Sequence, residues 1–201
     1  MTDLVGDAKR ALRKELRSRR RAMTETETSA STATLTDHLI SLATELGITS
    51  MSAYLSASFE PNTRPFLNWA NEQGIRVLFP ITRDDGLLDW AVSTDFETET
   101  EGLFGLPEPV GEILSPMAIN DVDLIVVPAA QIDHSGMRMG WGKGYFDKTL
   151  GSMEKRPPVY AVVFDTEYVE SVPSERHDQA VDGVVTPSGI HRFSASSKIR
   201  S

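Results

Sequence analysis

A continuous apolar run, "DLIVVP" at residues 123–128, constrains the fold more than any other stretch of the sequence. Most of its apolar residues are β-branched, and a proline closes it. Near-continuous apolar strands are typical of parallel sheets that helices cover on both faces, because neither face of such a strand meets water. The run therefore predicts a buried strand of a covered, mostly parallel sheet.

The rest of the chain alternates between strand and helix patterns. Short apolar runs predict strands, and apolar residues spaced three or four apart predict helices. Strands are expected at residues 51–56, 75–82, 87–93, 158–165 and 182–189, and helices at 63–74 and 144–153. The segment 96–118 is rich in glycine and proline, which predicts a long loop over the surface.

Two helices are expected before the first strand. The first is basic and amphipathic, with Ala8, Leu12 and Leu16 forming its apolar stripe. The second should begin at Thr24, because Thr24 and a glutamate three residues later form a capping box, and should end at Gly47. Together these elements predict an α/β protein with three layers, α/β/α, around a mostly parallel, Rossmann-like open sheet in one domain, residues 1–201.

Composition excludes several classes of protein. The 201 residues include no cysteine, so a disulfide framework, a zinc–thiolate site and a thiol nucleophile are all excluded. No apolar run approaches the roughly 20 residues of a membrane span, which predicts a cytoplasmic protein without membrane contact. The net charge of −9 argues against general nucleic-acid binding, although residues 9–21 carry eight Lys or Arg. We expect a monomer.

The segment "RMGWGKGYFD", residues 138–147, has the features of a phosphate site. Gly140, Gly142 and Gly144 alternate, which leaves backbone N–H groups free to approach an anion. Lys143 and Arg138 add positive charge, and Asp147 could hold magnesium. The segment is neither a Walker A loop nor a dinucleotide fingerprint, and an ordinary glycine-rich turn is the competing interpretation.

A longer motif around this segment resembles one known family. The stretch "VPAAQIDHSGMRMGWGKGYFD", residues 127–147, is similar to the motif of 5-formyltetrahydrofolate cyclo-ligases, also called methenyltetrahydrofolate synthetases. Residues 8–23, 54–65, 105–109 and 172–187 add further stretches in the order that the family shows. The resemblance covers nearly the whole chain. Two departures are Phe146, where the family usually has tyrosine, and Ala129, where a glycine is common.

The resemblance implies a reaction and the residues that perform it. The family converts 5-formyltetrahydrofolate and ATP, with magnesium, into 5,10-methenyltetrahydrofolate, ADP and phosphate, through a phosphorylated formyl group that the nitrogen at position 10 attacks. Lys143 and Arg138 are the expected catalytic residues. The expected ATP-binding residues are Lys9, Arg13, Arg138, Gly140, Gly142, Lys143, Gly144, Tyr145 and Phe146. For Lys9 and Arg13, a solvated basic helix is the alternative.

The folate and metal sites follow in the same way. Leu55 and Glu60 match folate-contacting positions of the family, and a carboxylate at Glu60 can accept paired hydrogen bonds from the pterin. Trp141 and Tyr145 could supply flat walls for the pterin, or could belong to the core. Asp147 and Asp178 are the expected magnesium ligands, with Asp182 competing for the second position.

Two other functions remain open at this point. A sugar-phosphate isomerase or a CoA-transferase-like enzyme could use a similar α/β scaffold, because a fold does not fix a reaction. A non-catalytic protein could instead bind RNA or a protein partner through the basic first helix. That helix lacks interleaved aromatic residues, which ranks RNA binding below catalysis on small molecules.

Overall fold

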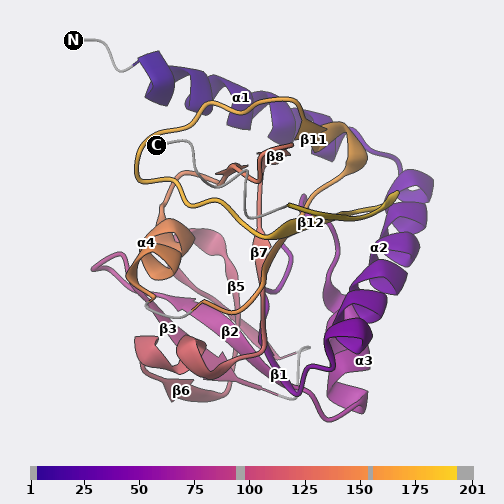
Figure 1. Ribbon diagram of the computed structural model, residues 1–201, viewed down its shortest axis with the longest axis vertical. Coiled ribbons are helices and arrows are strands. Elements are labelled where there is room, and N and C mark those ends of the chain that lie inside the picture. The colour runs from indigo at the N-terminus through magenta and orange to yellow at the C-terminus, as the bar shows by residue number, and fades with distance from the viewer. Residues whose placement is uncertain (1–3, 94–97, 154–155, 194–201) are drawn as a thin grey trace.

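A computed structural model describes residues 4–93, 98–153 and 156–193 and has an eight-stranded sheet at its centre (Figure 1). The strands from β12 to β2 run parallel to one another, and β13, β3 and β6 are antiparallel to their neighbours. In the order of the sheet the strands are β13 (Gly189–Arg192), β12 (Gly183–Thr186), β10 (Val159–Val162), β7 (Leu124–Pro128), β1 (Ser50–Ser52), β2 (Arg76–Thr82), β3 (Leu88–Val92) and β6 (Glu112–Leu114).

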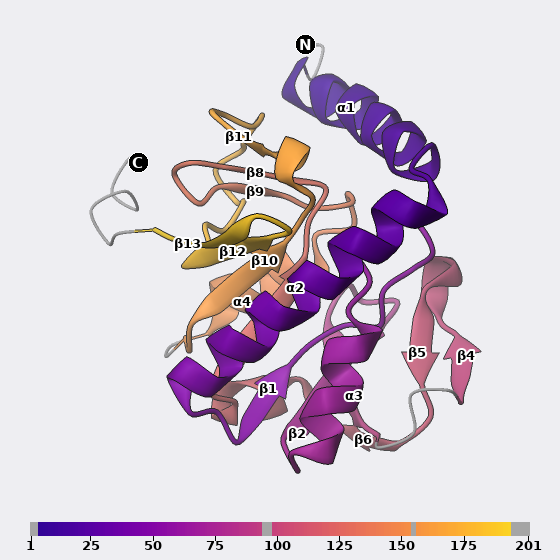
Figure 2. The same ribbon diagram turned by 90° about the vertical axis from the view of Figure 1, so that its right-hand side faces the viewer.

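Helices cover both faces of this sheet. Helices α2 (Glu25–Leu46) and α3 (Arg64–Glu72) pack on one face, and α4 (Tyr145–Ser152) with the 3₁₀ helix η2 (Pro116–Asp121) packs on the other (Figure 2). Each face has its own cluster of buried apolar side chains, and β7 contributes alternate residues to the two clusters. The predicted α/β class with a mostly parallel central sheet is therefore confirmed.

Helix α1 (Leu4–Arg21) lies across the top of the sheet in Figure 1, near the carboxyl ends of the parallel strands. It buries Lys9, Leu16 and Arg20, whereas Ala8 is exposed. The predicted apolar stripe is confirmed at Leu16 and Leu12, which pack in one apolar cluster, and was wrong only at Ala8. The buried residues of α1 are Lys9, Leu16 and Arg20. Lys9 and Arg20 form ion pairs with acidic residues on later segments.

A buried ion pair fixes the C-terminal end of α1. Arg20 donates from Nε to Oε1 and from Nη2 to Oε2 of Glu167, each at 2.7 Å, and both side chains are 2% exposed. Glu167 belongs to the 3₁₀ helix η3 (Asp165–Glu167), which follows β10. Arg20 Nη2 also donates to the carbonyl of Ala129, just after β7, at 2.9 Å. The pair therefore joins α1 to two segments at the end of the sheet.

The start and the end of α2 are as the sequence predicts. Thr24 is the N-cap, with both hydrogen bonds of the capping box to Glu27, and Gly47 closes the helix in the left-handed conformation at φ 59°. Thr24 and Gly47 thus act at their predicted positions.

Three regions differ from the sequence-based expectation. The predicted loop 96–118 contains strands β4 (Glu99–Glu101), β5 (Pro107–Pro109) and β6, and the 3₁₀ helices η1 (Leu103–Gly105) and η2; its residues 96 and 97 lie outside the described residues. The strand expected at 51–56 ends at Ser52. A small second sheet, which the sequence did not predict, consists of β11 (Tyr168–Val169), β8 (Gln131–Asp133) and β9 (Arg138–Met139).

The Arg20–Glu167 pair gives a stability prediction. Glu167→Gln removes the charge that compensates the buried guanidinium, so the free energy of unfolding should fall by about 3–5 kcal/mol. Urea denaturation followed by circular dichroism measures this change.

A matched control comes from the exposed pair between Arg19 and Glu15 on the same helix. Glu15→Gln should cost less than about 1 kcal/mol, because water screens an exposed pair. Equal losses in the two variants would contradict the anchoring role of Arg20.

Candidate active site

The glycine-rich segment forms a tight loop between β9 and α4. Gly142 and Gly144 have φ angles of 102° and 72°, which side chains other than glycine rarely adopt. A Cβ atom at Gly142 would also lie 3.0 Å from Nη1 of Arg13. Arg13 Nε donates to the carbonyl of Gly140 at 2.8 Å, so α1 contacts this loop directly. Gly144 is the N-cap of α4, and the loop therefore leads into a helix N-terminus.

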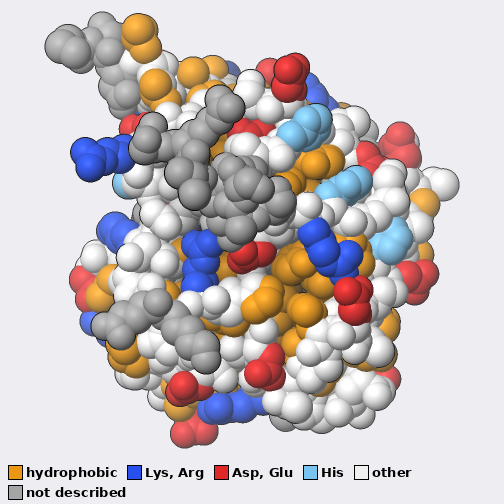
Figure 3. Space-filling view, in the orientation of Figure 1, with side chains coloured by type: hydrophobic (Ala, Val, Ile, Leu, Met, Phe, Trp, Pro, Cys, Tyr) orange, Lys and Arg blue, Asp and Glu red, His pale blue; other side chains and the backbone are white. Residues whose placement is uncertain are grey.

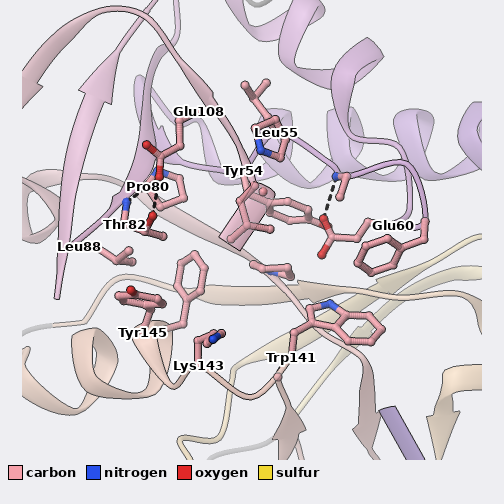
Figure 4. A pocket seen from close by; sticks show the side chains of 18 of the residues that line it. Tyr54, Leu55, Glu60, Pro80, Thr82, Leu88, Glu108, Trp141, Lys143 and Tyr145 are labelled. Atoms are coloured by element: carbon pink, nitrogen blue, oxygen red, sulfur yellow. Dashed lines mark hydrogen bonds between the residues drawn. The ribbon is translucent and has the colours of Figure 1, made fainter. Parts of the chain in front are cut away.

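One cavity, of about 430 Å³, opens at the carboxyl ends of β1, β2 and β7, and we call it the sheet-end cavity. In Figure 4, Tyr54, Leu55 and Glu60 lie across it from Trp141, Lys143 and Tyr145. The first group follows β1, and the second comes from the glycine loop and the start of α4. All four residues predicted to bind folate, Leu55, Glu60, Trp141 and Tyr145, line this cavity.

Glu60 is held in a largely desolvated position. Its Oε2 accepts a hydrogen bond from the Ala57 N–H at 2.9 Å, and its side chain is mostly buried. Burial raises the pKa of Glu60, and the Ala57 hydrogen bond and the positive charge of Arg20 only partly offset that rise. Hydrogen bonds from the N–H donors of a ligand would stabilise the charged form of such a carboxylate.

Three charged residues that the sequence analysis did not assign also line the sheet-end cavity: Arg17, Arg21 and Glu108. Glu108, from the "GLPEP" stretch, accepts hydrogen bonds at Oε1 from the N–H and the hydroxyl of Thr82, at 2.8 and 2.7 Å. Arg17 places its guanidinium 5.1 Å from the centre of the Trp141 ring. The spacing of Arg17 four residues after Arg13, on the same side of α1, could have indicated its position.

A second cavity, of about 710 Å³, lies between α1, the glycine loop, α4 and the loop 175–179, and we call it the α1 groove. Its lining has five cationic and three acidic side chains. The cations are Lys9, Arg10, Arg13, Lys143 and Lys148, and the acids are Asp147, Glu175 and Asp178. In a chain with a net charge of −9, this groove is locally positive and suits a polyanion.

Lys9 is the most buried cation of the groove. Its Nζ donates to Asp178 Oδ2 at 2.5 Å and to Glu175 Oε2 at 2.7 Å. Burial alone would lower the pKa of Lys9, but the hydrogen bonds and charges of Asp178 and Glu175 outweigh burial and raise it. Lys9 is therefore charged at neutral pH and ties α1 to the loop after β11.

Arg138 and Asp147 form the corresponding pair on the glycine loop. Arg138 Nη2 donates to Asp147 Oδ1 at 2.7 Å, and Nη1 donates to the carbonyl of Pro128 at 3.3 Å. Asp147 Oδ1 also accepts from the Gln179 N–H at 3.2 Å. Arg138 thus links the end of β7 to the first turn of α4.

The carboxylates of the groove suit a hard divalent cation such as magnesium, which prefers oxygen ligands. Asp147 and Asp178 both line the groove, and ligand atoms of Glu175, His177 and Asp178 lie within 4.8 Å of one another. Glu175 was not predicted. Asp182, the competing candidate, instead accepts a hydrogen bond from the Val159 N–H at 2.9 Å, between β10 and β12. The donor set therefore favours Asp178 over Asp182.

The two cavities meet at the glycine loop. Four residues line both of them: Gly140, Lys143, Gly144 and Asp147. Tyr145 and Phe146, which were predicted to bind ATP, line the sheet-end cavity only. Lys143 thus stands where a ligand in one cavity would face a ligand in the other.

Other tryptophan and histidine side chains lie away from the two cavities. Trp69 stacks on Phe66, and Trp90 is fully buried with its indole N–H donating to the Pro116 carbonyl at 3.2 Å. Several histidine side chains are exposed on the face in Figure 3. The rings of His134 and His191 both contact the ring of Tyr168. Among the described residues, none of these side chains lines the sheet-end cavity or the α1 groove.

The described helices include none with the length and apolar character that crossing a membrane requires.

Known proteins that resemble this chain share one family name. The sequence profile of the 5-formyltetrahydrofolate cyclo-ligase family matches residues 5–187. The 5-formyltetrahydrofolate cyclo-ligase of Mycolicibacterium smegmatis is 37% identical over 140 residues, which cover 67% of this chain and 72% of the relative. The protein of the same name from Mus musculus is 27% identical over 195 residues, covering 90% and 94%.

A solved structure agrees with these sequence relatives. The structure of Aquifex aeolicus 5,10-methenyltetrahydrofolate synthetase matches with a TM-score of 0.76 and 26% identity, over 92% of each chain. The profile match includes every segment that builds the sheet-end cavity and the α1 groove. The chain belongs to the 5-formyltetrahydrofolate cyclo-ligase family, a family of ATP-dependent ligases.

Proposed function

We propose that this protein converts 5-formyltetrahydrofolate and ATP into 5,10-methenyltetrahydrofolate, ADP and phosphate. The formyl oxygen attacks the γ-phosphorus of ATP, and ADP leaves. The nitrogen at position 10 then attacks the activated formyl carbon and loses its proton, and the carbon–oxygen bond breaks to release phosphate. The first step needs the two ligands held in line and a cation beside the moving phosphoryl group, and the second needs the position-10 nitrogen close to the activated carbon and stabilisation of the leaving phosphate.

The observation that carries this proposal is the wall that the two cavities share. A ligand in the sheet-end cavity and one in the α1 groove would meet at Gly140, Lys143 and Gly144. Lys143 would neutralise the phosphoryl group as it passes from ATP to the formyl oxygen. The loop amides and the N-terminus of α4 would add to this stabilisation.

The sheet-end cavity is the proposed folate site. Glu60 would accept hydrogen bonds from the pterin N–H groups. Because Glu60 is desolvated, these hydrogen bonds would stabilise its charge more than they would in water. Trp141, Tyr145 and Leu55 would supply apolar walls for the ring. Arg138 also lines this cavity, where its charge would lie near the formyl group while it holds Asp147 in place.

The α1 groove is the proposed nucleotide site. Lys9 and Arg13 come from α1, and Lys143 comes from the glycine loop, so the groove presents cations from two sides. The Arg13 guanidinium already contacts the loop through Gly140. The phosphates of ATP would share Lys9 with its present partners Glu175 and Asp178.

Asp147 and Asp178 are the proposed magnesium ligands. Magnesium would supply neutralisation of the triphosphate charge when bound. Both carboxylates line the nucleotide groove, and each is oriented by a buried cation, Arg138 or Lys9. The competing functions need no such arrangement, because an isomerase has no use for a triphosphate site.

The direct test is an absorbance assay with 5-formyltetrahydrofolate. Methenyl product should form only with ATP and magnesium, with one ADP released for each product molecule. Product formed without ATP, or no product under any of these conditions, would exclude the proposed reaction.

Lys143→Ala should lower turnover by about 100-fold or more, because the transferred phosphoryl group loses its cation. The affinity for 5-formyltetrahydrofolate, measured by calorimetry, should change little. Lys14→Ala removes an exposed lysine of α1 outside both cavities and serves as the control. If Lys143→Ala keeps normal turnover, Lys143 has no role in the transfer.

Glu60→Gln should raise the KM for 5-formyltetrahydrofolate at least about tenfold and leave the KM for ATP nearly unchanged. Because burial raises the pKa of Glu60, wild-type kcat/KM for folate should fall on acidification at a pH above the ordinary glutamate range. This acid limb should be missing in Glu60→Gln.

The control for Glu60 is Glu112→Gln, which changes an exposed glutamate of β6. Its pH profile should match that of the wild type. A larger effect of Glu60→Gln on ATP than on folate would remove Glu60 from the pterin site.

Asp147→Asn should raise the magnesium concentration for half-maximal rate about tenfold, because one anionic ligand becomes neutral. The amide oxygen can still accept the hydrogen bond from Arg138, which limits structural damage. Asp37→Asn, at an exposed position of α2, is the control. Identical magnesium titrations for Asp147→Asn and the wild type would argue against metal binding at Asp147.

A further inference from the structure

Glu108 is a carboxylate of the sheet-end cavity to which the proposed reaction gives no role. It lies on β5 and is 8% exposed. Its Oε1 accepts the two hydrogen bonds from Thr82 at the end of β2, and a Cβ atom at Gly102 would collide with the carboxylate. The backbone at Gly102 thus passes close to the side chain on one side, and Thr82 holds it from another. Glu108 is therefore fixed in position before a ligand binds.

The second carboxylate oxygen of Glu108, Oε2, remains open to a ligand. Within the described part of the chain, no group donates a hydrogen bond to this oxygen. The atom is not sealed off in the protein, because it keeps accessible surface. Since Glu108 lines the sheet-end cavity, a ligand in that cavity can reach Oε2.

The second step of the proposed reaction must release a proton. The nitrogen at position 10 carries one hydrogen, and it becomes positively charged when it bonds to the activated formyl carbon. The N–H of such an anilinium-type cation is strongly acidic, so a carboxylate is basic enough to take its proton. The methenyl product forms only after this proton leaves, because the nitrogen must share its electron pair with the carbon. A carboxylate placed beside this nitrogen would therefore accelerate the second step.

The other acids of the cavity already have partners or tasks. Among the described residues, three acids and no histidine line the sheet-end cavity. Glu60 is the proposed pterin ligand. Asp147 accepts hydrogen bonds from Arg138 and from the Gln179 N–H, and it is a proposed metal ligand. Glu108 is the acid that remains to accept a proton.

The place of Glu108 in the cavity fits the shape of the substrate. Figure 4 shows Glu60 and Glu108 at opposite ends of the cavity, with Lys143 on the wall that faces them. In a folate, the 2-amino group and the nitrogen at position 10 lie at opposite ends of the pterin. With the 2-amino edge at Glu60, the reacting atoms point toward Lys143 and Glu108. We infer that Glu108 is the general base of the second step, an inference that rests on the function proposed above.

The proton transfer adds no co-reactant to the reaction. Oε2 of Glu108 takes the proton from the position-10 nitrogen once the bond between this nitrogen and the formyl carbon has formed. The freed electron pair of the nitrogen then moves into its bond to the carbon. The carbon–oxygen bond breaks, and phosphate leaves with the electrons of that bond. Glu108 passes its proton to water and becomes a carboxylate again.

Glu108→Gln separates the two steps of the reaction. The amide oxygen can still accept the hydrogen bonds from Thr82, but the base is lost, so kcat should fall about 100-fold. The KM values for 5-formyltetrahydrofolate and ATP should change little. Because the first step is not slowed, rapid-quench measurements should show a burst of about one ADP per active site before methenyl product appears.

Formate gives a second measurement, which a purely structural role would not affect. Glu108→Ala leaves space where the carboxylate was, so added formate should restore part of its turnover. Formate should not restore Glu108→Gln, because the amide fills that space. Each variant is compared with and without formate in one preparation, so a loss of stability affects both measurements equally.

The matched control is Glu101→Gln, which changes an exposed glutamate of β4 in the same two-stranded sheet and outside both cavities. Its kcat should equal that of the wild type, and formate should have no effect on it.

The outcomes separate this inference from the proposed reaction. A normal kcat in Glu108→Gln, or a raised KM for folate without a loss of kcat, would overturn the role of Glu108 as a base. ADP release slowed as strongly as product formation would also overturn it, because the loss would then lie in the first step. A Glu108→Ala variant that formate does not restore would count against it equally. If the wild type neither binds 5-formyltetrahydrofolate in calorimetry nor forms product, the reaction itself is excluded, and this role with it.

Discussion

The bidentate ion pair between Arg20 and Glu167 decides where α1 lies, and both ligand cavities depend on α1. A buried charge is costly unless it is paired and hydrogen-bonded. Here Glu167 also accepts a hydrogen bond from the Phe164 N–H at 2.9 Å, and Arg20 contacts the end of β7 through the Ala129 carbonyl. With α1 fixed at this end, Lys9 and Arg13 follow on the same helix and reach the loops beyond the sheet. The Arg20–Glu167 contact, which lies outside the α1 groove, therefore helps to fix the helix that forms one wall of the groove.

Charge balance then shapes the groove. Asp178 is oriented by Lys9 and Asp147 by Arg138, so the acids that could hold a metal are already neutralised by buried cations. Such pairs keep the site ordered in the absence of ligand, because neither charge is left without a partner. An incoming triphosphate would exchange one anionic partner of Lys9 for another. The cost of exchanging partners is smaller than the cost of desolvating an isolated charge.

The sequence predicts this molecule best where local chemistry decides the structure. The capping box at Thr24 forms as predicted, and Gly142 and Gly144 adopt positive φ angles that glycine permits, because turn and cap geometry depends on neighbouring residues. Hydropathy identifies Leu16 on the buried side of α1 but not Lys9 and Arg20, because a cation counts as exposed until its partner, more than 100 residues away, is known. Strands β4 and β5 were missed because three-residue strands with prolines show no period.

The candidate site likewise contains residues that local sequence predicts and residues that only the folded structure reveals. Motif residues such as Lys143 and Glu60 lie in the cavities as their motifs predict, whereas Glu108 and Glu175 are recognised only from the cavity and the ion pair that contain them. Burial raises the pKa of Glu60, so its charged form costs stability in the ligand-free protein, and Glu60 lines the sheet-end cavity. Arg20 and Glu167, buried as deeply outside that cavity, bind each other in bidentate geometry. In the sheet-end cavity, by contrast, burial raises the pKa of Glu60, and a ligand that brings N–H donors to this carboxylate would offset the cost of its desolvation.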